Sequence, residues 1–206
     1  MGGKFIVFEG VDGSGKGTML AKTAEWLFNC CTEHDKIVLT REPTFSGYGA
    51  QIRRALKADH EPMTKAKQLL NLYFQDRKEH INKLIKPALQ LGSIVLCDRY
   101  KYSTIAYQHA QGIPMETIIA MHKRLLVPDL VLILDVEPKT AMKRIRTGRS
   151  SIEKFEKDFF IEEIRQNYLN IKKALPEEPI RLIDANGEPE EVFLKVKKEI
   201  QKTLKT

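Results

Sequence analysis

The 206-residue sequence contains little cysteine, and its cysteines do not form a metal-binding pattern. Only three are present: Cys30 and Cys31 are adjacent, and Cys97 stands alone. Because no C-x-x-C pair occurs, neither a zinc ribbon nor a thiol redox motif is indicated. Cys97 lies within an apolar run, so we expect a small, buried hydrophobic side chain at this position.

The sequence also lacks any apolar run of the roughly 18 residues that a membrane-spanning helix needs. Its amino terminus passes directly into the strand-like run KFIVFEG, without the layout of a secretory signal. These features predict a cytoplasmic protein without a membrane partner.

No internal repeat and no Pro- or Ser-rich linker interrupts the chain, so residues 1–206 are predicted to form a single domain. The formal net charge is +7. This excess of positive charge favours anionic partners, and nucleic acids, membrane surfaces and nucleotides all qualify. The basic tail VKKEIQKTLKT is interpreted more simply, as the solvated face of a helix.

Five short apolar runs have the continuous hydrophobicity of strands in a parallel sheet. They are Phe5–Glu9, Ile37–Thr40, Ile94–Asp98, Leu130–Asp135 and Ile180–Asp184. Helical patterns occupy the intervening segments and the carboxyl terminus. They are Lys16–Phe28, Tyr48–Lys57, Thr64–Leu91, Pro114–Leu126, Pro138–Arg146, Glu153–Leu175 and Glu190–Leu204. The alternation predicts an α/β fold with helices on both faces of the sheet, and ligands beyond the carboxyl ends of the strands.

The stretch FEGVDGSGKGT follows the first predicted strand and opens the first predicted helix. It contains the spacing of a phosphate-binding loop, with Gly10, Gly15 and Lys16 in place. Backbone amides of such a loop surround phosphates at the positive end of the helix, and the lysine adds a point charge. The predicted ATP-binding residues are Gly10, Val11, Asp12, Gly13, Ser14, Gly15, Lys16, Gly17 and Thr18.

The loop departs from the usual pattern at one position. Gly17 stands where a Ser or Thr hydroxyl would bind magnesium, and the hydroxyl comes one residue later, on Thr18. Magnesium keeps several waters and needs few protein ligands. The G-K-G-T variant resembles the loop of adenylate kinases. We therefore interpret the site as intact, with magnesium held mostly through water and ATP.

Together with five further segments, the loop resembles the thymidylate kinase family, whose members phosphorylate dTMP with ATP. The segments are TREPTFSGYGAQIRR, YFQDRKEH, DRYKYSTIAYQ, PDLVLILDVEP and RIRTGRSSIEKFEKDFF. The resemblance covers nearly the whole chain, and DRY followed by S..AYQ is not shared by phosphate-loop proteins in general. It implies a P-loop kinase three-layer sandwich, conversion of dTMP to dTDP for dTTP synthesis, magnesium as MgATP, and a homodimer.

Phosphoryl transfer between two nucleotides requires positive charge from separate parts of the chain. Arg53 follows the second predicted strand, Arg77 lies within a long helical pattern, and Arg99 follows the third strand. The planar fork of an arginine can hold a phosphate through two hydrogen bonds. The resemblance implies that Arg77 and Arg99 bind the dTMP phosphate with help from Arg53, and that Lys16 and Arg99 are catalytic.

Three more residues take family roles near the metal and the sugar. Asp98 ends a buried strand, where a carboxylate is costly unless it is paired or near a metal; the resemblance implies that it orients hydrated magnesium. Asp12 would contact the 3′-hydroxyl or the phosphate of the acceptor. Tyr107 would occupy the space of a ribose 2′-hydroxyl.

The resemblance also implies a base-binding wall. Ser103, Thr104 and Gln108 would line the base side of the acceptor. Many relatives have a base-stacking Phe four residues before Arg77, whereas this chain has Tyr73. A tyrosine ring can stack equally well, and we expect Tyr73 to contact the base.

Two further segments match family features. Glu42–Pro43 resembles a turn with a cis peptide beside the acceptor site. Residues 144–160 resemble a mobile lid over ATP. The loop stretch VDGS carries no positive charge, so the lid is expected to supply it. The candidates are Arg144, Arg146 and Arg149, and Arg149 ranks first because TGRSS is the most loop-like part.

The sequence is also compatible with other functions. The chain could be another nucleoside monophosphate kinase acting on AMP, UMP or dUMP; the G-K-G-T loop supports this slightly and DRYKYSTIAYQ opposes it. It could be a basic NTPase that binds nucleic acid, although it has no aromatic-basic stacking motif. A non-catalytic nucleotide sensor would be expected to lack some acceptor arginines. A stable nucleic-acid partner is not expected.

Overall fold

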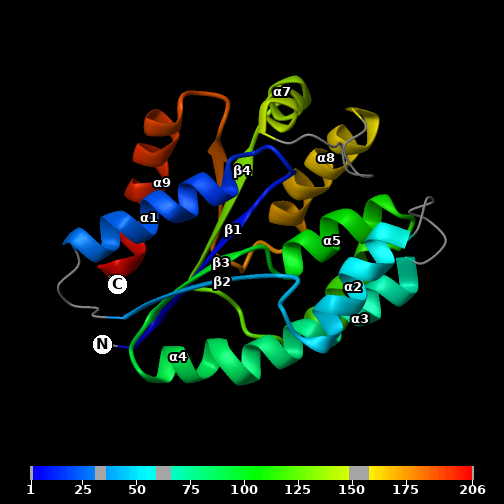
Figure 1. The fold of residues 1–206 in the computed structure, drawn as a ribbon, viewed down its shortest axis with the longest axis horizontal. Coiled ribbons are helices and arrows are strands. Elements are labelled where there is room, and N and C mark those ends of the chain that lie inside the picture. The colour runs from blue at the N-terminus through cyan, green and yellow to red at the C-terminus, as the bar shows by residue number, and fades with distance from the viewer. Residues whose placement is uncertain (1, 31–35, 59–65, 149–157, 206) are drawn as a thin grey trace.

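The computed structural model describes residues 2–30, 36–58, 66–148 and 158–205, in which strands alternate with helices (Figure 1). The strands are β1 (Lys4–Glu9), β2 (Ile37–Arg41), β3 (Ile94–Asp98), β4 (Leu130–Asp135) and β5 (Ile180–Asp184). The helices are α1 (Lys16–Cys30), α2 (Gly47–Ala58), α3 (Ala66–His80), the π-helical η1 (Ile81–Ile85), α4 (Lys86–Gln90), α5 (Lys101–Ala110), α6 (Met115–His122), α7 (Pro138–Gly148), α8 (Asp158–Ala174) and α9 (Pro189–Leu204). Three predicted strands have the observed bounds, and β1 and β2 are each one residue longer than predicted.

The strands form one parallel sheet in the order β2-β3-β1-β4-β5, which confirms the predicted five-stranded parallel sheet. Strand β1 lies at the centre of the sheet, between β3 and β4. Its residues from Phe5 to Glu9 are buried because helices cover both faces of the sheet. In the register between β1 and β3, Phe8 pairs with Asp98. The loop after β1 and the residues after β3 therefore lie side by side.

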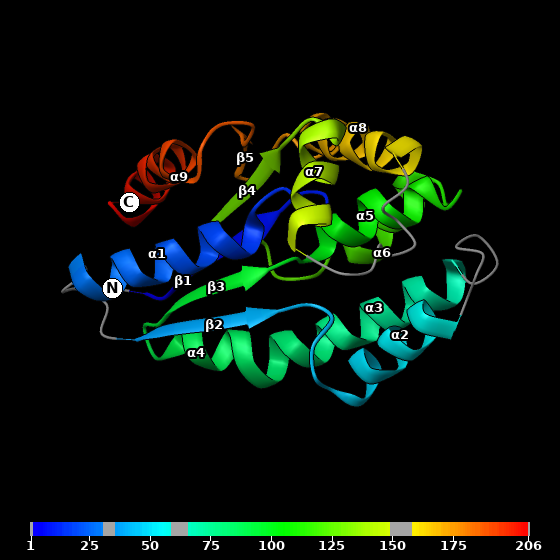
Figure 2. The ribbon, with the colours of Figure 1, turned by 45° about the horizontal axis from the view of Figure 1, so that its top comes forward.

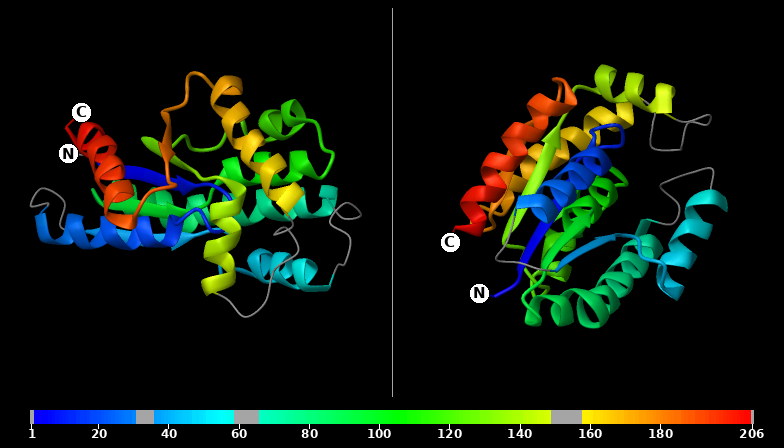
Figure 3. Two further views of the ribbon diagram at one scale, coloured as in Figure 1. Left: turned by 90° about the horizontal axis from the view of Figure 1, so that it is seen from above. Right: turned by 60° about the vertical axis from the view of Figure 1, so that its left-hand side comes forward.

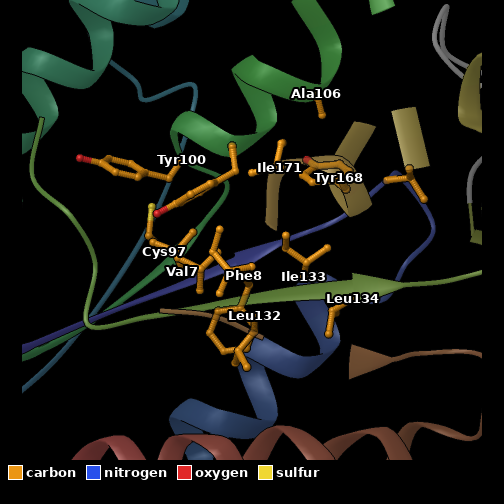
Figure 4. Close-up of a cluster of buried hydrophobic side chains, with 14 of the residues drawn as sticks. Val7, Phe8, Cys97, Tyr100, Ala106, Leu132, Ile133, Leu134, Tyr168 and Ile171 are labelled. Carbon is orange, nitrogen blue, oxygen red and sulfur yellow. The ribbon is translucent and has the colours of Figure 1, made fainter. Parts of the chain in front are cut away.

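Helices cover both faces of the sheet. Helices α1 and α9 pack against each other on one face, whereas α4, α5 and α8 cover the other (Figures 2 and 3). Figure 4 shows side chains of β1 and β4 between α1 on one side and α5 and α8 on the other, with Phe8, Leu132, Tyr168 and Ile171 labelled. These residues are buried. The layers confirm the predicted α/β fold.

Helix α5 corrects the sequence analysis, which predicted no helix between Lys101 and Ala110. Seven of its ten residues are buried, including the polar Lys101 and Gln108, so it has no apolar stripe to mark it as a helix. Its Tyr, Ser, Thr and Ile residues also have weak helix propensity. Burial between α3, α6 and α8, rather than local preference, determines this helix.

Two predicted elements extend into residues that the structure does not describe. The helix predicted from Thr64 is described from Ala66 as an unbroken run of α3, η1 and α4. The predicted lid over 144–160 overlaps the end of α7 and the start of α8, and residues 149–157 lie outside the described part of the chain. Among the described helices, none is both long and apolar enough to cross a membrane.

Candidate active site

A cavity of about 550 Å³ lies beyond the carboxyl ends of β1, β2 and β3. Most of the residues predicted to bind nucleotides line it. They are Asp12, Gly13, Gly15, Lys16, Gly17, Thr18, Arg53, Tyr73, Arg77, Asp98, Arg99, Ser103, Thr104, Tyr107 and Gln108. Gly10, Val11 and Ser14 belong to the same loop without lining the cavity. Arg149 lies outside the described residues.

The phosphate loop has the backbone conformation that its glycines permit. Gly10, Gly13 and Gly15 all have positive φ, with 77° at Gly13. A Cβ on Gly13 would overlap the backbone carbonyl of Ala141 in α7. Glycine at this position thus allows α7 to approach the loop. At Gly17, by contrast, an added Cβ would meet nothing within 4 Å.

Lys16 is buried at the start of α1. Its Nζ donates hydrogen bonds to the carbonyl oxygens of Gly10 (3.0 Å) and Val11 (2.8 Å) within the loop. Burial, together with the nearby charge of Arg99, lowers the pKa of Lys16 to about 8. The lysine is held over the loop, where phosphates bind in proteins of this type.

Arg99 follows β3 with a φ of 71°, the one positive φ at a non-glycine residue in the described chain. An arginine in this region is strained unless its surroundings hold it. Its Nη2 lies 2.6 Å from Oδ1 of Asp12, and its Nη1 donates to Oγ of Ser103 (3.0 Å). The guanidinium also lies over the ring of Tyr107 at 5.2 Å. Arg99 thus joins the phosphate loop to α5.

Glu9, which the sequence analysis did not single out, anchors the start of α5. Its buried carboxylate accepts hydrogen bonds from the backbone N–H groups of Tyr100 (2.7 Å) and Ser103 (3.1 Å). It also accepts from the hydroxyls of Ser103 (2.6 Å) and Tyr168 (2.9 Å). Burial raises the pKa of Glu9. An acidic residue inside an otherwise apolar strand was the available sequence signal.

Arg77 lies on a different wall of the cavity and is 1% exposed. Its Nε donates to Oε2 of Glu42 (2.8 Å) and its Nη2 to Oγ1 of Thr104 (3.0 Å). Its Nη1 lies 2.8 Å from Nε2 of His122, which the sequence analysis did not identify. The guanidinium stacks over Tyr100 at 5.2 Å. All three nitrogens of the guanidinium therefore have partners within the protein.

The turn after β2 is held from α2 and α3. The Glu42–Pro43 peptide is cis, as predicted. Asp76, another residue that sequence reasoning missed, accepts hydrogen bonds from the backbone N–H (2.8 Å) and hydroxyl (2.6 Å) of Thr44. Arg53 donates to the carbonyl oxygen of Thr44 (2.6 Å). Arg53 thus lines the cavity while it supports this turn.

Asp98 is suited to a hydrated cation. Its Oδ2 accepts from Arg41 (3.2 Å), whereas its Oδ1 is buried and has no hydrogen-bond partner within the described chain. No cluster of three potential metal-binding His, Cys, Asp or Glu residues occurs in the described ranges. Asp98 and Thr18 both line the cavity, and one carboxylate with one hydroxyl fits magnesium that keeps most of its waters.

The base-side candidates lie along α5 and α3. Gln108 is buried; its Nε2 donates to Oε1 of Gln111 (3.0 Å), and its Oε1 is unpaired among the described atoms. Thr104 is buried beside Arg77. Tyr73 is half-buried, and burial raises the pKa of its hydroxyl to about 12, so the ring stays neutral.

Two of the three lid-arginine candidates are described. Arg144 donates from Nη1 to the carbonyl oxygen of Ala185 (2.9 Å) and from Nη2 to that of Gly187 (3.1 Å). It thereby holds the loop that follows β5. Arg146 is exposed near the end of α7. Both belong to α7, whose last residues overlap the start of the predicted lid.

Comparisons with known proteins identify the family of this chain. The family model described as thymidylate kinase matches residues 8–196. The chain is 39% identical to the probable thymidylate kinase of Thermococcus kodakarensis, over 91% of this chain and 92% of that protein. It is 41% identical to the thymidylate kinase of Brachyspira hyodysenteriae, over 80% and 78%. The crystal structure of thymidylate kinase from Ehrlichia chaffeensis superposes with a TM-score of 0.75 at 32% identity, covering 98% of this chain and 99% of that one.

Proposed function

The chain belongs to the thymidylate kinase family, and we propose that it transfers the γ-phosphoryl group of ATP to dTMP, forming ADP and dTDP. The observation that carries this proposal is the contact of 2.6 Å between Arg99 and Asp12. It joins an arginine suited to an acceptor phosphate to the loop suited to the phosphates of ATP. A kinase that acts on two nucleotides needs both sites within one cavity.

On the donor side, the loop amides and Lys16 bind the phosphates of ATP. Without a nucleotide, the ammonium group of Lys16 donates to the carbonyl oxygens of Gly10 and Val11. We expect it to turn toward the phosphates when ATP binds, because charged phosphate oxygens are stronger acceptors. Magnesium, when bound, would neutralise part of the charge of the phosphates. Asp98 and Thr18, which both line the cavity, are the residues that would hold its hydration shell.

On the acceptor side, Arg99 binds the phosphate of dTMP. Asp12 orients the guanidinium of Arg99 and contacts the sugar of dTMP. Tyr107 stands beside Arg99 and limits the space for a 2′-hydroxyl. Arg53 supports the turn at Pro43 and Thr44, and Tyr73 stacks on the base.

Arg77 sits apart from this group. It contacts none of the side chains that hold Arg99, and it packs with Thr104 in the same wall as Gln108. Its buried position suits the base side of the cavity, whereas the predicted base-side residue Ser103 uses its hydroxyl to hold Arg99 and Glu9. A direct bond from Arg77 to the acceptor phosphate stays a prediction.

The transferred phosphoryl group still needs positive charge on its outer face. We propose that Arg149 supplies it from the segment between α7 and α8. Arg146 is the described alternative, because Arg144 is occupied by backbone carbonyls. The family resemblance supports two further proposals, a lid that spans about 144–160 and a homodimer. The sequence features described above support a single domain over residues 1–206, a cytoplasmic location and the expectation of no stable nucleic-acid partner.

One coupled assay tests the activity. ADP release from MgATP is measured with dTMP, dUMP, UMP and AMP as acceptors, for the wild type and Lys16→Ala. We expect dTMP to give the highest kcat/KM and Lys16→Ala to lose most turnover while remaining folded. Turnover of AMP equal to that of dTMP would remove the substrate assignment, and unchanged turnover in Lys16→Ala would remove the phosphate loop from the mechanism.

A further inference from the structure

We propose that His122 is a positioning residue of the acceptor site, whose imidazole fixes the guanidinium of Arg77 in the cavity wall. The inference rests on the proposed function, because Arg77 lines the part of the cavity that is proposed to bind dTMP. Nothing in the sequence motifs points to His122, which lies at the end of α6. The tertiary contacts of its two ring nitrogens carry the argument.

The hydrogen bonds of His122 define its tautomer. Its Nδ1 lies 2.7 Å from the carbonyl oxygen of Ile118, which can only accept, so Nδ1 carries the hydrogen. Its Nε2 lies 2.8 Å from Nη1 of Arg77, which can only donate, so Nε2 presents its lone pair. The ring is 1% exposed, and Phe74 packs edge-on against it at 5.5 Å. Orientation and tautomer are thus both determined by neighbours.

A neutral ring is required for this contact. The charged groups that face it are Arg77 from α3 and Lys101 from α5, and both are cationic. Burial, followed by Arg77, lowers the pKa of His122 to about 3, although the carbonyl of Ile118 opposes the shift. Protonation at Nε2 would remove the acceptor and place two cations in contact. At neutral pH the ring is therefore an acceptor for Arg77.

The choice of a neutral acceptor suits a site for an anionic nucleotide. Arg77 already has one carboxylate partner, Glu42, with Nη2 2.7 Å from Oε2. A second carboxylate at position 122 would leave this wall with an excess of negative charge, which would repel the acceptor. Without any acceptor there, one buried N–H of Arg77 would lose its partner, which is costly. The imidazole satisfies the donor without adding charge.

The consequence is a wall of defined geometry. Glu42, Thr104 and His122 hold the guanidinium from three directions, while Tyr100 supports its face. Thr104 and Arg77 both line the cavity. When a substitution removes the Nε2 acceptor at position 122, the guanidinium of Arg77 can rotate away from this arrangement. The cavity should then bind dTMP less well, while the phosphate loop still binds ATP.

The test compares three variants. His122→Leu removes the acceptor, and His122→Gln restores a neutral one through its amide oxygen. The control is His109→Leu, because among the described residues His109 bonds to the carbonyl oxygen of Ile113 and is not part of the cavity lining. We expect His122→Leu to raise the KM for dTMP on the order of tenfold, the cost of one buried, unpaired donor. The KM for MgATP should stay near that of the wild type, His122→Gln should recover most of the loss, and the control should show none.

Two results would overturn the proposal: an unchanged KM for dTMP in His122→Leu, or equal rises in the KM values for dTMP and MgATP. Nitrogen NMR of the wild type provides a second readout that does not need activity or a stable variant. A pattern of protonated Nδ1 and unprotonated Nε2, constant from about pH 5 to 9, supports the contact, and titration near the ordinary value of about 6.5 contradicts it. If the wild type does not phosphorylate dTMP, the proposed function fails, whereas the NMR pattern still tests the contact between His122 and Arg77.

Discussion

The guanidinium of Arg99 and the carboxylate of Asp12 form an ion pair, with Nη2 2.6 Å from Oδ1. The two residues are far apart in the sequence, but they follow neighbouring strands of the sheet. The pair holds Arg99 at the boundary between the phosphate loop and α5 before any substrate binds. Preorganised charge of this kind lowers the barrier to phosphoryl transfer more than charge that must be recruited.

Replacing Arg99 by lysine should therefore be severe, because an ammonium group cannot contact Asp12 and Ser103 as a planar fork does. We expect kcat/KM for dTMP to fall by about 100-fold, the scale of losing one oriented donor in a transition state. Steady-state kinetics with dTMP varied at saturating MgATP measures it. Arg181→Lys is the matched control, since Arg181 is largely exposed on β5 and pairs with Glu199 away from the cavity. Equal values for both variants would show that the guanidinium of Arg99 has no special role.

The lowered pKa of Lys16 predicts a pH dependence of ATP binding. In the free protein the ammonium loses its proton as the pH rises through about 8, and the neutral amine no longer attracts phosphate. The kcat/KM for ATP should fall above about pH 8, because this parameter reports the free enzyme. Bound phosphates favour the charged form and raise the pKa, so ATP binding near pH 9 should take up a proton. Calorimetry in buffers of different ionisation enthalpy detects that uptake.

Lys16→Arg is the control for this assignment. Arginine stays protonated throughout the range, so the alkaline limb should disappear even if the variant is slower overall. Persistence of the same limb in Lys16→Arg would assign the ionisation to another group.

The loop glycines provide a matched pair of substitutions. Gly17 has open space around its Cβ position, so Gly17→Ser should fold and keep ATP-dependent activity. The same change at Gly13 must overcome a positive φ and a collision with Ala141. Such strain costs about 1–3 kcal/mol before any clash is counted. We expect Gly13→Ser to lose ATP binding and thermal stability.

Titration with ATP and thermal unfolding compare the two glycine variants. The added hydroxyl in Gly17→Ser could serve as a direct magnesium ligand, so the magnesium concentration for half-maximal activity should fall or stay unchanged. Inactivity of Gly17→Ser with normal folding would refute a metal held mainly through water.

Arg149 is predicted to contact the transferred phosphoryl group only in the closed complex. Arg149→Ala should reduce kcat far more than it weakens dTMP binding, since interactions formed only in the transition state act on the rate. Clamping arginines of this type contribute roughly 10³ to 10⁵ in rate. Single-variant kinetics and dTMP titration test this, with Arg146→Ala and the double variant alongside. Near-normal turnover in all three would leave Lys16 and the acceptor arginines as the sources of charge.

The sequence by itself determined the features that are local. The buried strands were readable because each is a short, continuous apolar run, and three of them have the predicted bounds. The phosphate loop was readable because its chemistry lies within nine consecutive residues, from Gly10 to Thr18. The stretch DRYKYSTIAYQ carried the family resemblance, and the structure shows that one helix brings several of its side chains to the cavity.

Only the tertiary structure decided how these parts are held. Helix α5 has no apolar stripe, and its first turn is anchored by Glu9, about ninety residues earlier in the chain. The surroundings of Arg77 come from the turn after β2, from α5 and from α6, so no spacing in the sequence could reveal His122. A local pattern records which face of an element is apolar, whereas a buried polar contact is selected by the partners that the fold brings within hydrogen-bonding distance.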